Sequence, residues 1–513
     1  MFDGSASMRV RNIWKEHKAP FCTAMICGLL AFTYFFTNKL PNFDDVAFLF
    51  TKGAELESGR WGLELCELIF PNYSMPWLWG IISLVLMSVS ACLTVDLFRL
   101  KSGMLRCLLA GLIVVFPSQL TTFTYMFTSS SYAAAFLFAV LAVRTVRNAG
   151  HWWEYGIAWI LLTLSLGIYQ SYIAIAAGLF VLLMISDTYR TDEPVKKILL
   201  KGVIYLVFLL AAAAAYYGIT LLLLSARGQQ FGDYAQDALG NPQSLAQRFY
   251  TCFRSFMAVY VPNYRLYGLV VSPFSAYVHV AGAVAAVASA VWSYIRSWKW
   301  GRFAFLAALT VLVFPLSLTC MLFVAGELVV HTLVMYSFVL VYILLAIFVD
   351  PCLNCKEFFP AVCPRVLALC FALIIACNAV ESNRAALAEQ FEYENTYALY
   401  NTVAAQVQGT PGFTSKTRVA LIGKAPVSNV MKTFGWSEIM GVMGAYDGNA
   451  ITLRNGWSRE DFIHFFLGLD WNFVSEEEVK ELAKSGEVRE MPSYPDYGYV
   501  QLSGDVILVK LSD

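Results

Sequence analysis

Long apolar runs, separated by short polar connections, fill the first three quarters of the chain. Eleven of these runs approach the roughly 20 helical residues that are needed to cross the hydrocarbon core of a bilayer. Two pairs of runs meet at short polar hinges, Tyr169-Gln170-Ser171 and Gly326-Glu327, which are either hairpin tips or re-entrant bends. The predicted spans cover residues 19–37, 77–97, 105–121, 127–143, 155–169, 171–187, 198–224, 277–295, 303–324, 328–349 and 365–380.

At about Glu381 the pattern changes to that of a soluble α/β unit. Alternating apolar and polar residues on either side of Ser503-Gly504-Asp505 predict a β-hairpin. The other expected elements are helices over 381–408, 459–467 and 476–485 and a buried strand over 418–422. We therefore predict an α-helical polytopic membrane domain over residues 1–380 and an α/β domain over residues 381–513.

The composition supports a membrane protein. Of the 513 residues, 58% are apolar and only 14% are charged, whereas soluble domains carry about 25% charged residues. The formal net charge is zero, so nothing indicates the basic surface of a nucleic-acid-binding protein. We therefore expect membrane lipid, and no nucleic acid, among the partners of this chain.

The distribution of Lys and Arg between alternate connections predicts the orientation of the spans. Cytoplasmic loops of membrane proteins carry an excess of basic residues, and one set of connections holds most of them here. We therefore expect a cytoplasmic amino terminus and an extracytoplasmic α/β domain. The residues of the basic set are Arg9, Arg11, Lys15, Lys18, Arg99, Lys101, Arg106, Arg144, Arg147, Arg190, Lys196, Lys197, Lys201, Arg296, Lys299, Arg302, Lys356 and Arg365.

The first long outer loop, residues 38–76, opens with the acidic pair Asp44 and Asp45. An ionisable group at the membrane costs several kcal/mol unless it faces a cavity, so such groups are usually functional. In a helix the two side chains point about 100° apart, and we expect one to take a proton while the other holds a sugar hydroxyl, a cation or an arginine. The alternative is that both only cap a helix.

The same loop supplies further candidates. Glu55, Glu57, Arg60 and Trp61 follow the acidic pair. Trp61, Leu65, Leu68 and Ile69 fall on one helical face, with Arg60, Glu64 and Glu67 on another. This pattern predicts an amphipathic helix that lies in the membrane interface.

The second long outer loop, residues 225–276, mixes arginines and tyrosines with prolines. This composition suits sugars and phosphate, because a guanidinium binds phosphate through paired hydrogen bonds. The alternative for each arginine is snorkelling at the interface. The candidates in this loop are Arg248, Arg254, Tyr264 and Arg265, and Glu327 and His331, one turn apart near another hinge, are further candidates unless they are an ordinary hairpin-tip pair.

The cysteines do not indicate a metal site. Most of the 12 lie inside apolar runs, where a thiol packs as a small hydrophobe. Cys352, Cys355 and Cys363 approach a zinc pattern, but no histidine lies near enough to complete four ligands. No metal ligands are therefore predicted, and no cofactor is required, although a divalent cation at the acidic pair stays open.

An enzyme whose acidic residues lie outside the membrane has no cytosolic nucleotide to use, so its donor must arrive in the lipid. A polyprenyl-phosphate sugar meets this requirement. Its tail enters between helices, its phosphate pairs with Arg or Lys, and a carboxylate base activates the acceptor hydroxyl.

Four short motifs occur in order along the chain. They are Phe43-Asp44-Asp45, Gly59-Arg60-Trp61, Gly167-Ile168-Tyr169-Gln170-Ser171-Tyr172, and the ending made of Met491-Pro492-Ser493-Tyr494-Pro495 with Val506-Ile507-Leu508-Val509-Lys510-Leu511. With these motifs the chain resembles the bacterial serotype-converting, Gtr-type glucosyltransferases, which belong to the C-type (GT-C) superfamily of multispan glycosyltransferases. The resemblance covers most of the chain in layout.

The resemblance implies an enzyme of the bacterial cytoplasmic (inner) membrane. Such an enzyme moves glucose from undecaprenyl phosphate glucose to a cell-surface polysaccharide such as O-antigen, or to its lipid-linked precursor. Asp44 or Asp45 then acts as general base, and Arg60, Tyr169 and Gln170 join the donor-binding candidates. The identity of the sugar comes from the resemblance alone.

Two other classes of function remain as alternatives. A lipid-linked oligosaccharide flippase or other transporter is expected to carry ionisable residues at mid-membrane and internal repeats, whereas these spans are nearly free of charge and show no repeat. A receptor role for the outer domain needs far fewer spans than this chain has. The sequence therefore favours a glycosyltransferase.

Overall fold

The structure, a computed structural model, describes residues 4–38, 40–49, 55–71, 73–232, 243–260, 272–297, 300–325, 332–425, 454 and 458–513. The chain divides into two compact units. The first is formed by Met1–Asn38 and Lys52–Asn383, and the second by Lys39–Thr51 and Arg384–Asp513. Each unit is described by itself below.

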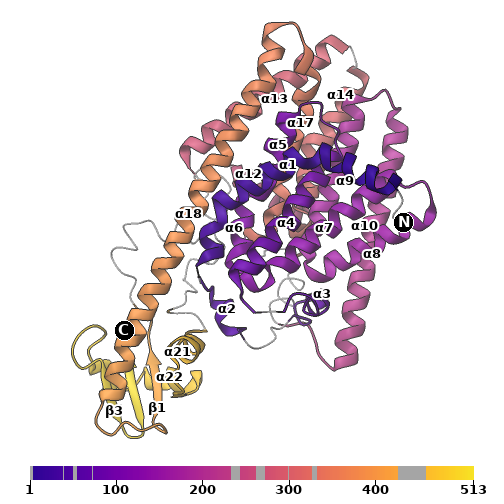
Figure 1. Ribbon diagram of the computed structural model, residues 1–513. Helices are drawn as coiled ribbons and strands as arrows, with labels where there is room; N and C mark the ends of the chain where they lie inside the picture. Colours follow the sequence, from indigo (N-terminus) through magenta and orange to yellow (C-terminus); the bar gives the residue numbers. More distant parts are fainter. Residues whose placement is uncertain are drawn as a thin grey trace. The chain divides into compact units, whose positions relative to one another are not determined.

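The first unit is a bundle of apolar helices (Figure 1). Its helices are α1 (Gly4–Thr37), α3 (Trp61–Cys66), α4 (Pro76–Asp96), α5 (Gly103–Val114), α6 (Pro117–Thr124), α7 (Met126–Asn148), α8 (Trp152–Ile168), η1 (Gln170–Tyr172), α9 (Ile173–Arg190), α10 (Val195–Arg227), α12 (Leu245–Tyr260), α13 (Pro273–Ser297), α14 (Trp300–Ala308), η2 (Leu309–Val313), α15 (Phe314–Leu318), α16 (Cys320–Ala325), η3 (Thr332–Val339), α17 (Leu340–Val349), η4 (Asp350–Asn354) and the first half of α18 (Phe358–Gly409).

Ten helices in the described part of the chain are long and apolar enough to cross a membrane. They match ten of the eleven runs predicted from the sequence, and the remaining run, α8, forms an apolar helix of 17 residues. A multi-pass helical protein is therefore supported. The ten candidate spans are Trp14–Thr37, Pro76–Asp96, Gly103–Thr124, Met126–Asn148, Gln170–Arg190, Val195–Arg227, Pro273–Arg296, Gly301–Leu318, Thr332–Asn354 and Phe358–Gly409.

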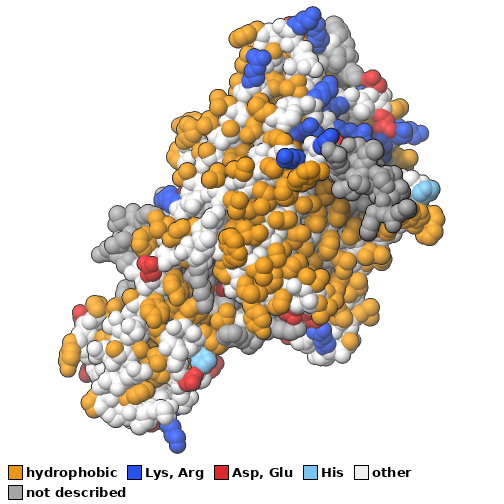
Figure 2. All heavy atoms as spheres, viewed as in Figure 1, with side chains coloured by type: hydrophobic (Ala, Val, Ile, Leu, Met, Phe, Trp, Pro, Cys, Tyr) orange, Lys and Arg blue, Asp and Glu red, His pale blue; other side chains and the backbone are white. Residues whose placement is uncertain are grey.

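Burial distinguishes the centre of the bundle from its rim. In α9 every residue from Ala174 to Tyr189 is buried, as expected of a helix that is surrounded by others. In contrast, α10 and α13 expose large apolar side chains such as Leu200, Leu222 and Val280. Figure 2 shows hydrophobic side chains covering this surface, with many Lys and Arg side chains toward its upper end. Such a surface suits contact with lipid rather than water.

The hinge at Tyr169 is a tight connection. The helix α8 ends at Ile168, and one 3-10 turn, Gln170–Tyr172, leads into α9. Tyr169 has an extended backbone, with φ −150° and ψ 105°. The second predicted hinge, Gly326-Glu327, lies outside the described residues.

The second unit is a small α/β layer structure. Its elements are α2 (Phe43–Ala47), the second half of α18, β1 (Arg418–Ile422), α21 (Arg459–Leu467), β2 (Asn472–Phe473), α22 (Glu476–Leu482), α23 (Gly486–Glu490), β3 (Val500–Ser503) and β4 (Val506–Lys510). The strand order is β2-β1-β4-β3. β1 runs parallel to β2 and β4, and β3 pairs antiparallel with β4.

Both faces of this sheet are buried. Val419, Leu421, Ile507 and Val509 pack with residues of α18 and α21, and the alternate residues of the same strands pack with Val488 and Met491. The predicted strand over 418–422 and the predicted hairpin are confirmed. The helices predicted over 459–467 and 476–485 form as well, but the latter ends at Leu482.

Two expectations for the first outer loop need correction. The predicted interfacial helix over residues 61–69 ends at Cys66, and its apolar face is divided, because Trp61 is buried whereas Leu65, Leu68 and Ile69 are exposed. The acidic pair does not cap this helix. Asp44 and Asp45 lie in a separate five-residue helix, α2, whose N-cap is Asn42.

Candidate functional site

Residues 55–66 lie directly on the junction between α8 and α9. This close approach depends on two glycines, because a Cβ on Gly62 would come within 2.6 Å of the carbonyl carbon of Gly167. A Cβ on Gly167 would in turn come within 2.5 Å of the Trp61 ring. Trp61 is buried in a cluster with Leu56 and Leu224. Two of the sequence motifs, distant along the chain, are therefore in contact.

Arg60 is held against two tyrosine rings. Its Nη1 donates a hydrogen bond to the hydroxyl of Tyr132, at 3.2 Å. Its guanidinium carbon lies 5.5 Å from the centroid of the Tyr169 ring, a distance at which the cation and the ring attract each other. The rings of Tyr132 and Tyr169 stack with their centroids 4.5 Å apart. The guanidinium is therefore oriented by aromatic groups from α7 and from the α8–α9 junction.

Glu55 begins the tight turn that ends at Arg60. The side chain is only 8% exposed, and its backbone carbonyl accepts a hydrogen bond from the Arg60 N–H at 2.7 Å. Burial raises the pKa of the neighbouring Cys66 thiol; a hydrogen bond with Ser131 opposes this, and the Glu55 charge adds to it. The turn from Glu55 to Arg60 is therefore closed by a backbone hydrogen bond, and the buried Glu55 lies next to Cys66 of α3.

Hydrogen bonds also fix the neighbouring polar residues. The Nε2 of Gln170 donates to the carbonyl of Ser58 at 2.6 Å, which joins the 3-10 turn to the loop. The carboxylate of Glu57 accepts from Nε2 of Gln229 at 3.3 Å. The structure therefore brings together Arg60, Trp61, Tyr169 and Gln170, four of the residues proposed from the sequence, and Glu55 and Glu57 lie in the turn that precedes Arg60.

The site has the groups that a phosphorylated sugar requires. A guanidinium remains protonated at physiological pH and binds phosphate oxygens in a bidentate manner. Tyrosine hydroxyls donate and accept hydrogen bonds, as sugar hydroxyls do. In the described part of the chain, no group of three or more His, Cys, Asp and Glu side chains is placed to hold a metal ion.

The acidic pair belongs to the second unit, where its two members differ. Asp45 is 1% exposed, and its Oδ2 accepts the backbone N–H of Asn42 at 3.2 Å, which completes a capping box. It also interacts electrostatically with Glu389 of α18. Asp44 is half-buried, and its own N–H donates to Oδ1 of Asn42 at 2.8 Å. Asp45 therefore caps α2 from a buried position, and Asp44 is the more accessible carboxylate.

The remaining candidates are not part of the Arg60 site in the described residues. Arg248 is half-buried in α12, and its Nη1 donates to the carbonyl of Phe323 in α16 at 2.7 Å. Arg254 is an exposed residue of the same helix. Tyr264, Arg265, Glu327 and His331 lie outside the described residues.

Sequence reasoning missed the polar segment that precedes Tyr132. All eight residues of α6 are buried, and Thr121 shares a hydrogen bond of 2.6 Å with Thr332. Gln119 is 1% exposed, and neither polar atom of its amide has a hydrogen-bond partner among the described residues. The signal was present in the sequence, because residues 118–131 are rich in Ser and Thr within an apolar region.

Comparison with known proteins yields one match. The sequence profile of a family described as "Glucosyl transferase GtrII" matches residues 33–344, which is more than half of the chain. This range includes the Arg60 site and the acidic pair. No curated protein and no solved structure matches the chain.

Proposed function

Because the chain belongs to the GtrII glucosyl transferase family, and is thus a membrane glycosyltransferase, we propose that it transfers glucose from a polyprenyl-phosphate carrier. The acceptor is a cell-surface polysaccharide or its lipid-linked precursor. The family supports a sugar donor and a glycan acceptor. The lipid carrier follows from the position of the site at the ends of membrane spans, where a donor arrives from the bilayer.

The observation that carries this proposal is the position of Arg60. Its guanidinium lies against Tyr132 and Tyr169, where α8 ends and α9 begins. A phosphate at this point is bound by a cation of fixed orientation, and a lipid tail attached to the phosphate extends along apolar helices. Charge-assisted hydrogen bonds of this kind are about twice as strong as neutral ones.

In the proposed mechanism a carboxylate accepts the proton of the acceptor hydroxyl as that oxygen attacks the anomeric carbon of the donor. The bond between the anomeric carbon and the phosphate oxygen breaks, and polyprenyl phosphate leaves. We assign the base to Asp44, since Asp45 is buried in a capping box. The excess of basic residues at the other ends of the spans supports the outer face of the membrane as the side of this chemistry.

The test is transfer by the purified full-length protein from radiolabelled polyprenyl-phosphate glucose to candidate acceptors. Arg60→Ala is expected to raise the donor concentration for half-maximal rate by at least about tenfold, since a hydrogen bond to a charged group contributes about 1.5–3 kcal/mol. Arg227→Ala is the control, because Arg227 forms an exposed ion pair with Glu64 at 2.6 Å in the same unit. Exposed pairs contribute little.

Release of polyprenyl phosphate during the assay distinguishes a transferase from a transporter, since transport leaves the glycosyl bond intact. If Arg60→Ala and Arg227→Ala keep the same donor dependence as the wild type, Arg60 does not bind the donor phosphate.

A further inference from the structure

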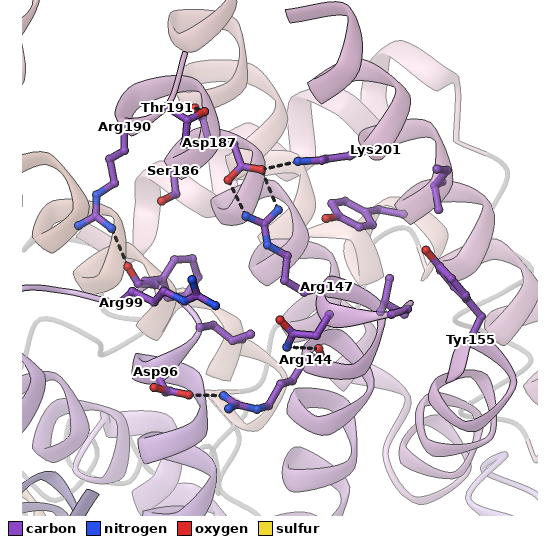
Figure 3. Close-up of a pocket in the computed structure, with 17 residues that line it drawn as sticks. Asp96, Arg99, Arg144, Arg147, Tyr155, Ser186, Asp187, Arg190, Thr191 and Lys201 are labelled. Atoms are coloured by element: carbon purple, nitrogen blue, oxygen red, sulfur yellow. Dashed lines mark hydrogen bonds and ion pairs between the residues drawn. The ribbon is translucent and has the colours of Figure 1, made fainter. Parts of the chain in front are cut away.

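The first unit has a polar pocket that does not include Arg60. It is a pocket of about 600 Å³ at the ends of α4, α7 and α9 and the starts of α8 and α10 (Figure 3). The helix α9 begins at Ile173, directly after the Tyr169–Tyr172 junction at the first site, and ends at Arg190 of this pocket, about 26 Å away at the helical rise of about 1.5 Å per residue. The two sites therefore lie at opposite ends of the same helices.

The pocket is lined by more basic than acidic groups. Five cations contribute to it and only two carboxylates, Asp96 and Asp187. Arg147 binds Asp187 through two hydrogen bonds of 2.7 and 2.6 Å, and Arg144 binds Asp96. Figure 3 shows both pairs as dashed lines among the residues that line the pocket. The cations are Arg99, Arg144, Arg147, Arg190 and Lys201.

Two of the five cations are neutralised by carboxylates that do not line the pocket. Arg190 pairs with Asp350 at 2.5 Å, and Lys201 pairs with Glu193 at 2.5 Å as well as with Asp187. The exposed Arg99 is different, because it has no side-chain hydrogen bond or ion pair among the described residues. The positive charge that remains for a ligand is therefore centred on Arg99.

Arg99 also has a strained backbone. Its φ is +46°, and no other non-glycine residue of the described chain has a positive φ. This left-handed conformation lies two residues beyond Leu97, the C-cap of α4, and glycine adopts it without strain. Non-glycine residues in such conformations are strained and often mark functional sites. Glycine would relieve this strain but would remove the cation from the pocket.

One wall of the pocket reaches the apolar surface of the bundle. Tyr155 of α8 and Ile204 of α10 line the pocket and are 36% and 41% exposed. Trp152 and Trp153, at the start of α8, are 84% and 49% exposed. Tryptophan at the end of a span is typical of the membrane–water interface. A ligand in this pocket can therefore keep an apolar tail in the bilayer.

We propose that this pocket binds the phosphate headgroup of a membrane lipid, with Arg99 as the phosphate ligand and the tail leaving past Tyr155 and Ile204. The volume of about 600 Å³ exceeds the needs of inorganic phosphate and fits a headgroup with the first part of its chains. The lipid is either an anionic phospholipid of the bilayer or a polyprenyl phosphate. This site is separate from the proposed donor site.

The test is native mass spectrometry of the full-length protein, with Arg60→Ala in every sample so that the first site does not contribute. The probes are phosphatidylglycerol, a polyprenyl phosphate, inorganic phosphate and diacylglycerol, which has no phosphate. Arg99→Gly removes the cation and relieves the backbone strain, so a loss of binding by this variant is not a loss of folding. Lys196→Gln is the matched control, because Lys196 is exposed at the same end of the bundle and does not line the pocket.

We expect one phosphate-bearing lipid to bind, and Arg99→Gly to weaken that binding by about tenfold or more, with a melting temperature equal to or above that of the parent. The Lys196→Gln protein keeps the parental affinity. Preference for phosphatidylglycerol identifies a bilayer lipid, and preference for polyprenyl phosphate identifies a carrier lipid. Equal binding by the parent and Arg99→Gly, or equal binding of diacylglycerol, overturns the proposal.

Discussion

At the scale of single residues, the neighbouring Asp44 and Asp45 differ in their surroundings. Asp45 stabilises the first turn of α2 and is buried, whereas Asp44 is half-buried. The sequence predicted different roles from the angle of about 100° between adjacent helical side chains. The sequence did not indicate which of the two carboxylates is buried. The residues that pack around this part of α2 come more than 340 positions later in the chain.

Asp44→Asn is expected to lower the rate of sugar transfer by about 10²- to 10⁴-fold, the usual contribution of a general base. Binding of the lipid donor is retained, because the base acts on the acceptor. Asp45→Asn is expected chiefly to destabilise the second unit. Steady-state transfer and donor binding are measured on the same preparations, with Asp470→Asn, an exposed carboxylate of that unit, as the control. Near wild-type rates for Asp44→Asn would show that this carboxylate is not the base.

A second residue-scale prediction concerns Glu460 of α21. Burial raises the pKa of its carboxyl; the charge of Arg459 opposes this rise, and the charges of Asp461 and Glu476 add to it. The folded state therefore binds this proton more tightly than the unfolded chain. Stability is lost as the pH rises from the ordinary Glu pKa of about 4.3 through the higher folded value.

Glu460→Gln removes this loss, so the variant is expected to be more stable than the wild type at pH 7. Near pH 3.5 the difference vanishes, because Glu460 is protonated in both states. Hydrogen exchange of β1 and β4, compared between variant and wild type at each pH, measures the effect. Glu477→Gln, at an exposed position of α22, serves as control. A difference of equal size at both pH values would exclude titration of Glu460 as the cause.

At the scale of elements, the junction of α8 and α9 depends on close contact between two backbones. Gly167→Ala would place a methyl group within 2.5 Å of the Trp61 ring, and overpacking of this kind typically costs about 1–3 kcal/mol. We expect lower thermal stability and weaker donor binding, since Arg60 adjoins Trp61. The control is Gly156→Ala in the same helix, where the added Cβ meets no atom within 4 Å.

Gly156→Ala is expected to leave activity unchanged and to stabilise α8 slightly, because alanine is favoured over glycine in a helix by about 0.5–1 kcal/mol. Melting temperatures and donor titrations of both variants test these expectations for stability and donor binding. Equal behaviour of the two alanine variants would mean that the loop does not lie on Gly167.

The same junction shows what local patterns can and cannot predict. Hydropathy located ten spans and the hinge at Tyr169, because a membrane imposes length and polarity on each segment separately. It did not predict that α3 would end at Cys66, or that Tyr132 would accept a hydrogen bond from Arg60. Both depend on contacts between segments that are more than 70 residues apart, which periodicity does not encode.

At the scale of the whole molecule, α18 is continuous through both units. Its 52 residues correspond to about 78 Å at the usual helical rise, more than twice the hydrocarbon thickness of about 30 Å. The sequence predicted this continuation and the strands that follow. It did not predict that Lys39–Thr51 would group with the second unit, since the evidence is the burial of Val46 among residues of α18 and β1.

A chain that ends at Asn383 is therefore expected to lose more than its last domain. Val46 is fully buried in the second unit, and without that unit α2, a helix of five residues, is too short to persist alone. Hydrogen exchange of residues 43–48 is predicted to become rapid, while exchange of α9 stays slow. Continued protection of residues 43–48 in the shortened chain would show that α2 does not need the second unit.

Residues 39–51 group with residues 384–513. This grouping has a consequence for recombination between the genes of such enzymes. A crossover near residue 384 between two family members would join the α2 of one parent to the second unit of the other. The core around Val46 would then combine side chains from two parents that did not evolve together. Asp44, two residues before Val46, would lie next to this altered core. Chimaeras intended to exchange acceptor preference should therefore transfer both segments together, and lineages that exchanged only the carboxyl-terminal part are expected to show compensating substitutions between positions 40 and 49.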